Sequence, residues 1–138
     1  MSDPFANLPA APPARPNTST TPAEISLDDI KDYISPKLYS ELSWDESRSG
    51  DDVTKDCISR AIEFASGLLY LVKEELNLYS KTQREVVKAL TVYELYLYNG
   101  DRRTANGWLE KAERLINDRY GNINAERENV SPVGAVRV

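Results

Sequence analysis

The chain has 138 residues, of which 28% are charged and 41% are hydrophobic, with a formal net charge of −5, one cysteine and no histidine. One thiol and no imidazole exclude an internal disulfide, an ordinary zinc site and catalysis by a histidine base or a Ser-His or Cys-His pair. No apolar run approaches the roughly 20 residues of a membrane span, no secretory leader pattern opens the chain, and no basic patch suits nucleic acid. We therefore expect one soluble, intracellular domain.

Proline divides the chain unevenly, because six of its eight prolines fall before residue 23. Residues 1–22 form a proline-rich arm that we expect to be extended, and disordered when alone, since it offers little apolar surface to offset the entropy of ordering. Residues 122–138 combine valines with Pro132 and Gly134, which predicts an extended tail. Both arms carry balanced charge, so the net −5 belongs to a helical core domain at 23–121.

Two short helices are expected at the start of this core. Ser26 followed by Asp29 resembles a capping box, and the apolar spacing that follows predicts a helix ending near Ile34. Ser35 and Pro36 then supply a cap and a favoured first helical residue for a second short helix.

A polar loop from Trp44 to Asp52 precedes the first of three long helices, expected from about Asp52 to Leu76. Its broad apolar arc predicts a central helix that is contacted from more than one side. Gly67 in this helix and Gly107 in the last one each cost about 1 kcal/mol relative to alanine, and we expect close helix approach to be the reason.

The second long helix is expected to start at a Thr82 cap with Glu85 completing the box, and to end at Gly100 in a left-handed conformation. Asp101 caps the third, which closes at Gly121. The predicted fold is all-α: a small bundle of three long helices plus one or two short N-terminal helices, with extended N- and C-terminal arms.

The segment at 45–56 partly follows a calcium-binding loop, with Asp45, Ser47, Ser49, Gly50 and Asp56 at its ligand and glycine positions. Ser47 and Ser49 stand where a calcium loop has carboxylates or amides, and Asp56 stands where it has the longer glutamate. We therefore favour a polar loop followed by an acidic helix start over a calcium site. A magnesium- or calcium-dependent carboxylate enzyme is the catalytic alternative. We expect no enzyme, no metal site and no cofactor.

Four side chains of the core are candidates for binding a partner: Tyr96, Tyr98, Arg102 and Arg103. Tyr96 and Tyr98 lie off the inward face of their helix to different sides, and tyrosine is favoured at interfaces, although neighbouring helices offer another explanation. The two arginines lie at a helix start that the dipole disfavours, so they are either solvated by chance or meet an acidic partner.

The two arms supply further candidates, because such segments become ordered on a partner. The alternative is that they are simple tails. The candidate residues are Phe5, Leu8 and Arg15 in the first arm, and Val130, Val133, Val136, Arg137 and Val138 in the tail.

An ordered pattern of helical packing residues covers about residues 26–121. It consists of Leu27-Asp28-Asp29-Ile30 with Tyr33-Ile34, an acidic loop leading into Val53 to Ala65 with Ala61-Ile62-x-x-Ala65, Val86-x-Lys88-Ala89-Leu90-x-Val92-Tyr93-x-Leu95-Tyr96, and Ala105-x-x-Trp108-Leu109-x-x-Ala112. This pattern resembles the head completion or head-to-tail adaptor (connector) proteins of tailed bacteriophages, especially the Mu-type branch. The proline-rich arm and the tail after Gly121 lie outside the pattern.

The resemblance implies a structural virion protein of the neck, present in the host cytoplasm during assembly. It implies a homo-oligomeric ring, commonly a dodecamer, that binds the portal protein, presents a surface to a stopper or tail protein, and extends a channel through which DNA passes without specific binding. The alternatives are another neck or tail-end protein, such as a stopper or tail terminator, or a non-viral helical interaction module. No membrane is involved in any of these.

Overall fold

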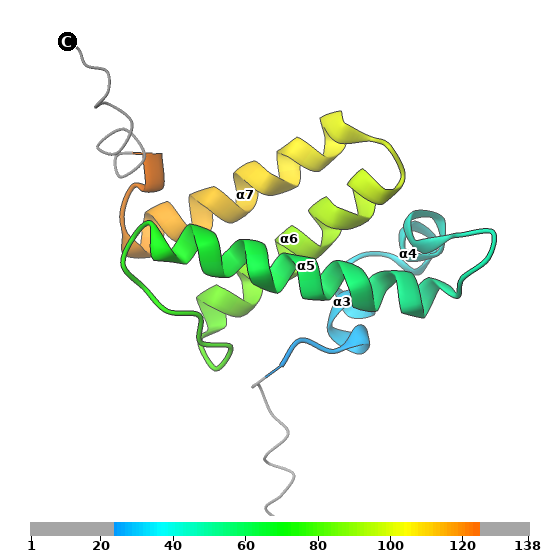
Figure 1. Ribbon diagram of the computed structural model, residues 1–138, viewed down its shortest axis with the longest axis horizontal. Helices are drawn as coiled ribbons and strands as arrows, with labels where there is room; N and C mark the ends of the chain where they lie inside the picture. The colour runs from blue at the N-terminus through cyan, green and yellow to red at the C-terminus, as the bar shows by residue number, and fades with distance from the viewer. Residues whose placement is uncertain (1–23, 125–138) are drawn as a thin grey trace, which may run out of the picture.

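The computed structural model describes residues 24–124, which form helices and, within that range, no strands (Figure 1). The helices are α3 (Leu27–Tyr33), α4 (Pro36–Ser43), α5 (Gly50–Tyr70), α6 (Lys81–Tyr98) and α7 (Arg102–Tyr120). Two short helices therefore precede three long ones, and the all-α prediction is confirmed. The predicted N-terminal arm, and the predicted tail from residue 125 on, lie outside the described residues.

Several helix ends follow directly from their capping residues. The Ser26 hydroxyl accepts a hydrogen bond from the Asp29 N–H at 3.2 Å, and the Asp29 carboxylate accepts one from the Ser26 N–H at 2.8 Å, which confirms the capping box of α3. Ser35 caps α4 and Asp101 caps α7, as predicted. Gly100 has φ +80 at the end of α6, where a left-handed residue is favourable.

Two helices begin earlier than expected. The Ser49 hydroxyl accepts a hydrogen bond from the Asp52 N–H at 3.0 Å, so α5 begins at Gly50 and not near Asp52. The predicted Thr82 cap is wrong, because the Ser80 hydroxyl accepts from the Gln83 N–H at 3.2 Å and places Thr82 inside the first turn of α6. In both cases an upstream serine reaches the free N–H groups first.

The predicted end of α5 at Leu76 is also wrong. The Lys73 N–H donates to the Tyr70 carbonyl at 3.0 Å, and the Glu74 N–H donates to the Leu69 carbonyl at 2.9 Å. These two bonds close the helix in a Schellman arrangement around Lys73, which has φ 62. A lysine stands where glycine is usual, so the sequence carries no obvious stop signal.

As predicted, α5 is contacted by more than one helix, since it packs against α3, α4 and α6; the central position, however, belongs to α6, which packs against all four other helices. In Figure 1, α7 runs beside α6 and α5 crosses it. The hydroxyl of Thr91, a buried residue of α6, donates to the Val87 carbonyl at 2.8 Å. This hydroxyl is therefore buried with a hydrogen-bond partner. The buried apolar residues of α6 are Val86, Val87, Ala89, Leu90, Val92 and Leu95.

Close helix approach does not explain Gly67 or Gly107, because a Cβ atom at either would meet nothing within 4 Å. The tight contact is instead at Gly50, where a Cβ atom would lie 2.6 Å from the Ser43 hydroxyl. That glycine lets the start of α5 approach the end of α4.

The packed body extends slightly beyond the predicted boundary at Gly121. The Ile123 side chain is fully buried, and its N–H donates to the Asn117 side-chain oxygen at 2.9 Å. Ile123 is therefore part of the folded core, which reaches beyond the predicted boundary. No helix within residues 24–124 has the length and apolar character needed to cross a membrane.

Candidate functional site

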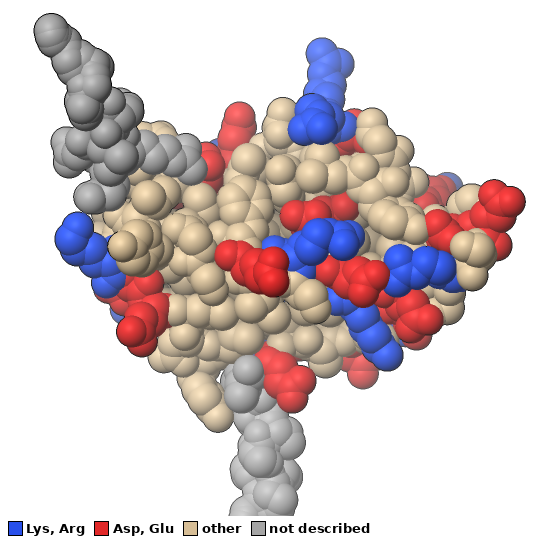
Figure 2. All heavy atoms as spheres, in the orientation of Figure 1, with Lys and Arg blue, Asp and Glu red and all other residues tan. Residues whose placement is uncertain are grey.

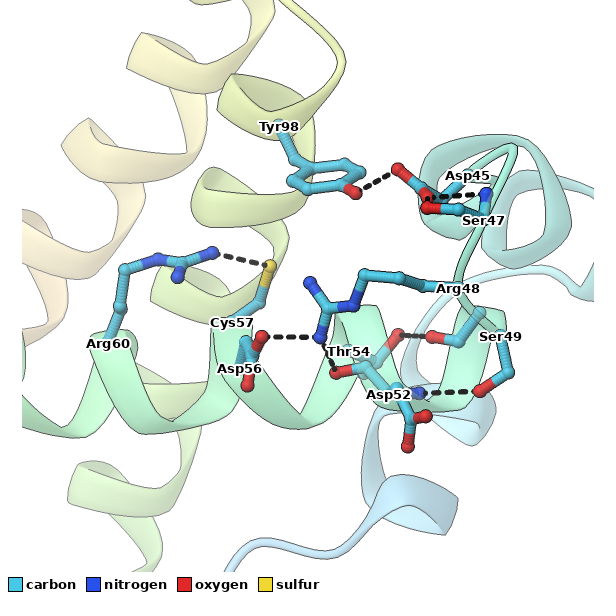
Figure 3. Close-up of polar contacts among 11 residues, drawn as sticks. Asp45, Ser47, Arg48, Ser49, Asp52, Thr54, Asp56, Cys57, Arg60 and Tyr98 are labelled. Atoms are coloured by element: carbon cyan, nitrogen blue, oxygen red, sulfur yellow. Dashed lines mark hydrogen bonds and ion pairs between the residues drawn. The ribbon is translucent and has the colours of Figure 1, made fainter.

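The α4–α5 connection and the α6–α7 turn meet at one end of the molecule. The Tyr98 hydroxyl, at the end of α6, donates to Asp45 (Figure 3). The Asn99 amide donates to the Leu42 carbonyl. Because α7 begins directly after this turn, Arg102 and Arg103 lie close to the same junction. We call this surface, residues 44–52 with 98–103, the charged end.

Asp45 organises the charged end through several hydrogen bonds. Its carboxylate accepts from the Tyr98 hydroxyl, from the Ser47 N–H at 2.9 Å and from the Ser47 hydroxyl at 3.1 Å. The hydrogen bond from Tyr98 lowers the pKa of Asp45, and the same bond raises the pKa of Tyr98. Tyr98, whose residue is 37% exposed, is thus held at a fixed position.

Arg48 joins the connection to the first turns of α5. Its guanidinium forms an ion pair with the Asp56 carboxylate and donates to the Asp52 carbonyl at 3.2 Å (Figure 3). The hydrogen bond to Asp56 raises the pKa of Arg48. Because both side chains of the pair are well exposed, its contribution to stability is small, but it orders the connection.

The carboxylates of the calcium-like segment serve different partners. Asp51 accepts from the Tyr39 hydroxyl at 2.8 Å and pairs with the Lys31 ammonium at 3.2 Å, whereas Asp45 and Asp56 bond as described above. The second half of the segment is helical, so it does not form a loop around an ion. Within residues 24–124 no three side chains of the metal-ligating kinds come together.

Trp44 is an exposed aromatic residue at the charged end that sequence reasoning missed. It is 67% exposed and borders a shallow groove of about 450 Å³. Tyr39, Ser40, Ser43, Arg48 and Asp51 are among the other residues that line the groove. The available signal was one tryptophan at the start of an otherwise polar stretch, and a large exposed ring of this kind favours a partner contact.

The predicted tyrosines have different environments. Tyr96 is partly buried and packs against the core, and this burial raises its pKa. Tyr93 packs its ring against Phe64 with centroids 5.6 Å apart, so neighbouring helices cover it. Tyr98 alone among the three belongs to the charged end, and partner binding by Tyr96 and Tyr98 stays a prediction.

Arg102 and Arg103, the first two residues of α7, lie outside the ion pairs of the described chain. Within residues 24–124, the ion pairs shown are Lys31–Asp51, Arg48–Asp56, Arg60–Glu94, Arg84–Asp29 and Lys88–Glu85. Neither Arg102 nor Arg103 belongs to these pairs, and both side chains are exposed. Figure 2 shows acidic side chains gathered at the end that holds the α4–α5 connection.

The arm candidates lie outside the described residues, so their roles stay predictions; they are Phe5, Leu8, Arg15, Val130, Val133, Val136, Arg137 and Val138. Comparison of the chain with protein-family models, curated proteins and solved structures found no match.

Proposed function

We propose that this protein is a structural head-to-tail adaptor of a tailed bacteriophage, forming a ring between the portal and the stopper or tail protein. The observation that supports this most directly is the location of the packing pattern that resembles the adaptor family. Many of its apolar residues lie in the buried core and the others pack against that core while partly buried, so the resemblance concerns how helices pack and not surface composition. The buried members are Ile30, Ile34, Val53, Cys57, Ala61, Ala65, Val86, Ala89, Leu90, Val92, Leu95, Ala105 and Ala112.

The charge of the folded body suits a channel component. Residues 24–124 carry 14 Lys and Arg against 19 Asp and Glu, which leaves a net charge of −5. An acidic body repels the phosphate backbone, so DNA can slide past it without being held. On this proposal DNA passes through the ring without specific binding.

A small folded body of this kind can bind its partners tightly when many copies form a symmetric ring. Weak contacts that are repeated around a closed ring act together, and extended arms add contact area without enlarging the core. The proposed partners are the portal, the stopper or tail protein and further copies of the chain, commonly twelve in a ring. The proposed location is the virion neck, reached through the host cytoplasm during assembly.

Co-expression of the full chain with the portal protein of the same virus tests the proposal. We expect the two to co-purify, and electron microscopy to show a ring of the chain stacked on the portal ring. A stopper, a tail terminator or a non-viral module would not bind the portal directly. Absence of co-purification, with both proteins folded and soluble, contradicts the adaptor function.

The arms are tested separately in assembling virus particles. A chain ending at Asn124 removes the tail and keeps the buried Ile123 and every other described residue. If the tail valines and Arg137 grip the portal, particles carrying this variant are expected to lack tails. Normal tailed particles would contradict the role of the tail while leaving the ring proposal to the portal experiment.

A further inference from the structure

The groove at the α4–α5 connection combines aromatic rings with carboxylates. The Trp44 ring, which is 67% exposed, and the Tyr39 ring line it together with Asp45 and Asp51, around a volume of about 450 Å³. The groove is shallow, so it suits an extended segment that lies across it better than an enclosed small molecule.

The charges on the lining of this groove do not cancel. Asp51 and Arg48, which both line it, each have an ion-pair partner. Asp45 accepts hydrogen bonds from Tyr98 and Ser47, which are neutral, and it makes no ion pair within residues 24–124 (Figure 3). A negative charge therefore lies beside the exposed ring, and this arrangement favours an occupant that carries a cation.

The proline-rich arm, outside the described residues, contains a segment of matching chemistry. Residues 9–16 read Pro-Ala-Ala-Pro-Pro-Ala-Arg-Pro, which is two successive Pro-x-x-Pro repeats with Arg15 in the second. Prolines at this spacing favour the polyproline II conformation, and such segments bind grooves lined by aromatic side chains. Arg15 is the one lysine or arginine of residues 1–22, and its charge is opposite to that of Asp45.

The chain between this segment and the folded body is long enough to reach the groove of the same copy. Pro16 and Glu24 are eight residues apart, a distance of about 26 Å when extended. The Lys31 ammonium lies 3.2 Å from Asp51 on the groove lining. A short stretch, one turn of α3 and a lysine side chain thus separate Glu24 from the groove, which is at most about 25 Å.

We propose that residues 9–16 dock in the groove of their own copy, with prolines against the Trp44 and Tyr39 rings and Arg15 beside Asp45. The tether gives the segment an effective concentration of about the millimolar range, so a contact that is weak between separate molecules is occupied here. The docked arm covers the exposed tryptophan, and any partner that binds this groove must displace it. The inference does not rest on the adaptor proposal.

Fluorine NMR of the full chain, labelled with 5-fluorotryptophan, tests this docking. Trp44 and Trp108 are its two tryptophans, so the spectrum reports on the groove and on one internal control. A soluble nitroxide broadens the signal of an exposed ring. We expect it to broaden the Trp44 signal at least about threefold less in the wild type than in P12A/P13A, because the variant loses two prolines of the docked segment. Trp108, which packs on Tyr33, is expected to respond equally in both chains.

P4A/P22A is the matched control for the prolines, since it removes two prolines of the same arm outside residues 9–16. It is expected to protect Trp44 as well as the wild type does. Circular dichroism of both double variants checks that the helical body is unchanged.

The proposed contact between Arg15 and Asp45 is tested from both sides. R15Q and D45N are each expected to increase the broadening of the Trp44 signal at least about twofold, because each removes one of the two opposite charges. The asparagine oxygen of D45N can still accept from Tyr98, so the connection keeps that bond. R15K keeps the positive charge, and D118N makes the same charge change as D45N at the far end of α7 (Figure 1). Both are expected to behave as the wild type.

A peptide of residues 7–18, added at about 2 mM to P12A/P13A, is expected to restore at least about half of the protection of Trp44. Its failure to do so, or equal exposure of Trp44 in the wild type and in P12A/P13A, would overturn the inference. So would protection that falls on dilution from about 0.5 to about 0.02 mM, because the arm of another copy would then fill the groove. A chain with protected Trp44 that binds no portal contradicts only the adaptor function, and a portal-binding chain with unprotected Trp44 contradicts only the docking.

Discussion

Tyr33 places a hydroxyl group in the interior with no hydrogen-bond partner among the described residues. Its ring is well accommodated: it meets Trp108 edge-on with centroids 5.8 Å apart, and the Lys88 and Lys111 ammonium groups lie 5.3 and 5.4 Å from its centre. The ring therefore stabilises the junction of α3, α6 and α7, whereas the hydroxyl carries a desolvation cost without a compensating bond.

Tyr33→Phe is expected to raise the free energy of unfolding by about 1 kcal/mol, because it removes the unpaired group and keeps the ring. Tyr120→Phe is the matched control, since the Tyr120 hydroxyl accepts from the buried Gln83 amide at 3.0 Å. That change should lower stability by about 1 kcal/mol. Urea unfolding measures both, and a loss of stability in Tyr33→Phe would contradict the burial of an unpaired hydroxyl at this position.

Cys57 is a buried thiol at the centre of α5. Burial raises the pKa of this thiol from the usual 9.0 to about 11, despite the opposing effect of Arg60. The thiolate is the reactive form, so Cys57 is nearly inert near neutral pH in the folded protein. We expect a thiol reagent at about pH 8 to label the native chain far more slowly than the urea-unfolded chain.

The same pKa shift makes stability depend on alkaline pH. Between pH 9.0 and about 11 the unfolded chain loses the Cys57 proton while the folded chain keeps it. Stability from this group is thus fully present below pH 9.0 and declines as the pH rises through about 11. Cys57→Ala should show a shallower decline over this window, and rapid labelling of the native wild type would contradict the burial on which both expectations depend.

At the scale of the helices, two glycines of α5 differ in what surrounds them. Gly67 has no neighbour within 4 Å of an added Cβ atom, whereas at Gly50 such an atom would lie 2.6 Å from the Ser43 hydroxyl oxygen and 3.2 Å from its Cβ. Ser43 is buried, and its hydroxyl donates to the Tyr39 carbonyl at 2.6 Å, so it cannot turn aside without losing that bond.

Gly67→Ala is expected to raise the free energy of unfolding by about 1 kcal/mol through helix propensity alone. Gly50→Ala is expected to lower it by about 1–3 kcal/mol through overpacking between α4 and α5. Thermal and urea unfolding of the two variants, which carry the same substitution in the same helix, test the expectation. Equal effects in both would show that the α4–α5 contact relaxes freely.

The helix starts are the part of the fold most readable from sequence, because a cap involves residues close in the chain. Ser26, Ser35 and Asp101 are examples, and the errors at the starts of α5 and α6 were two residues or less. The end of α5 was not readable, since a lysine at φ 62 is held there by the surrounding chain and not by its own preference.

The candidate site was only partly readable, for a related reason. Arg102 and Arg103 stood out because a basic pair is unfavourable at a helix start. The contact between Asp45 and Tyr98 joins residues 53 positions apart, and no local pattern marks it. That contact places the acidic connection beside the basic pair, so the charged end is a property of tertiary structure.

For the molecule as a whole, the extent of the folded unit decides which truncations are informative. Ile25 and Ile123 lie near the two limits of the described chain, and both side chains are buried in the same core. The hydrophobic core therefore includes residues just outside the first and last helices of the described chain, α3 and α7. An experiment that removes an arm must leave these two side chains in place.

Chains ending at Asn124 and at Gly121 differ by three residues, of which Ile123 alone is buried. The chain ending at Gly121 is expected to lose about 2–5 kcal/mol of unfolding free energy, because the site of a fully buried isoleucine becomes a cavity. The chain ending at Asn124 is expected to unfold within about 0.5 kcal/mol of the full chain, since it keeps every buried residue of the described core. Urea unfolding of the three chains measures the difference. Equal stability of both truncated chains would show that Ile123 adds little to the core, whereas a large loss at Asn124 would show that the tail itself stabilises the helical body.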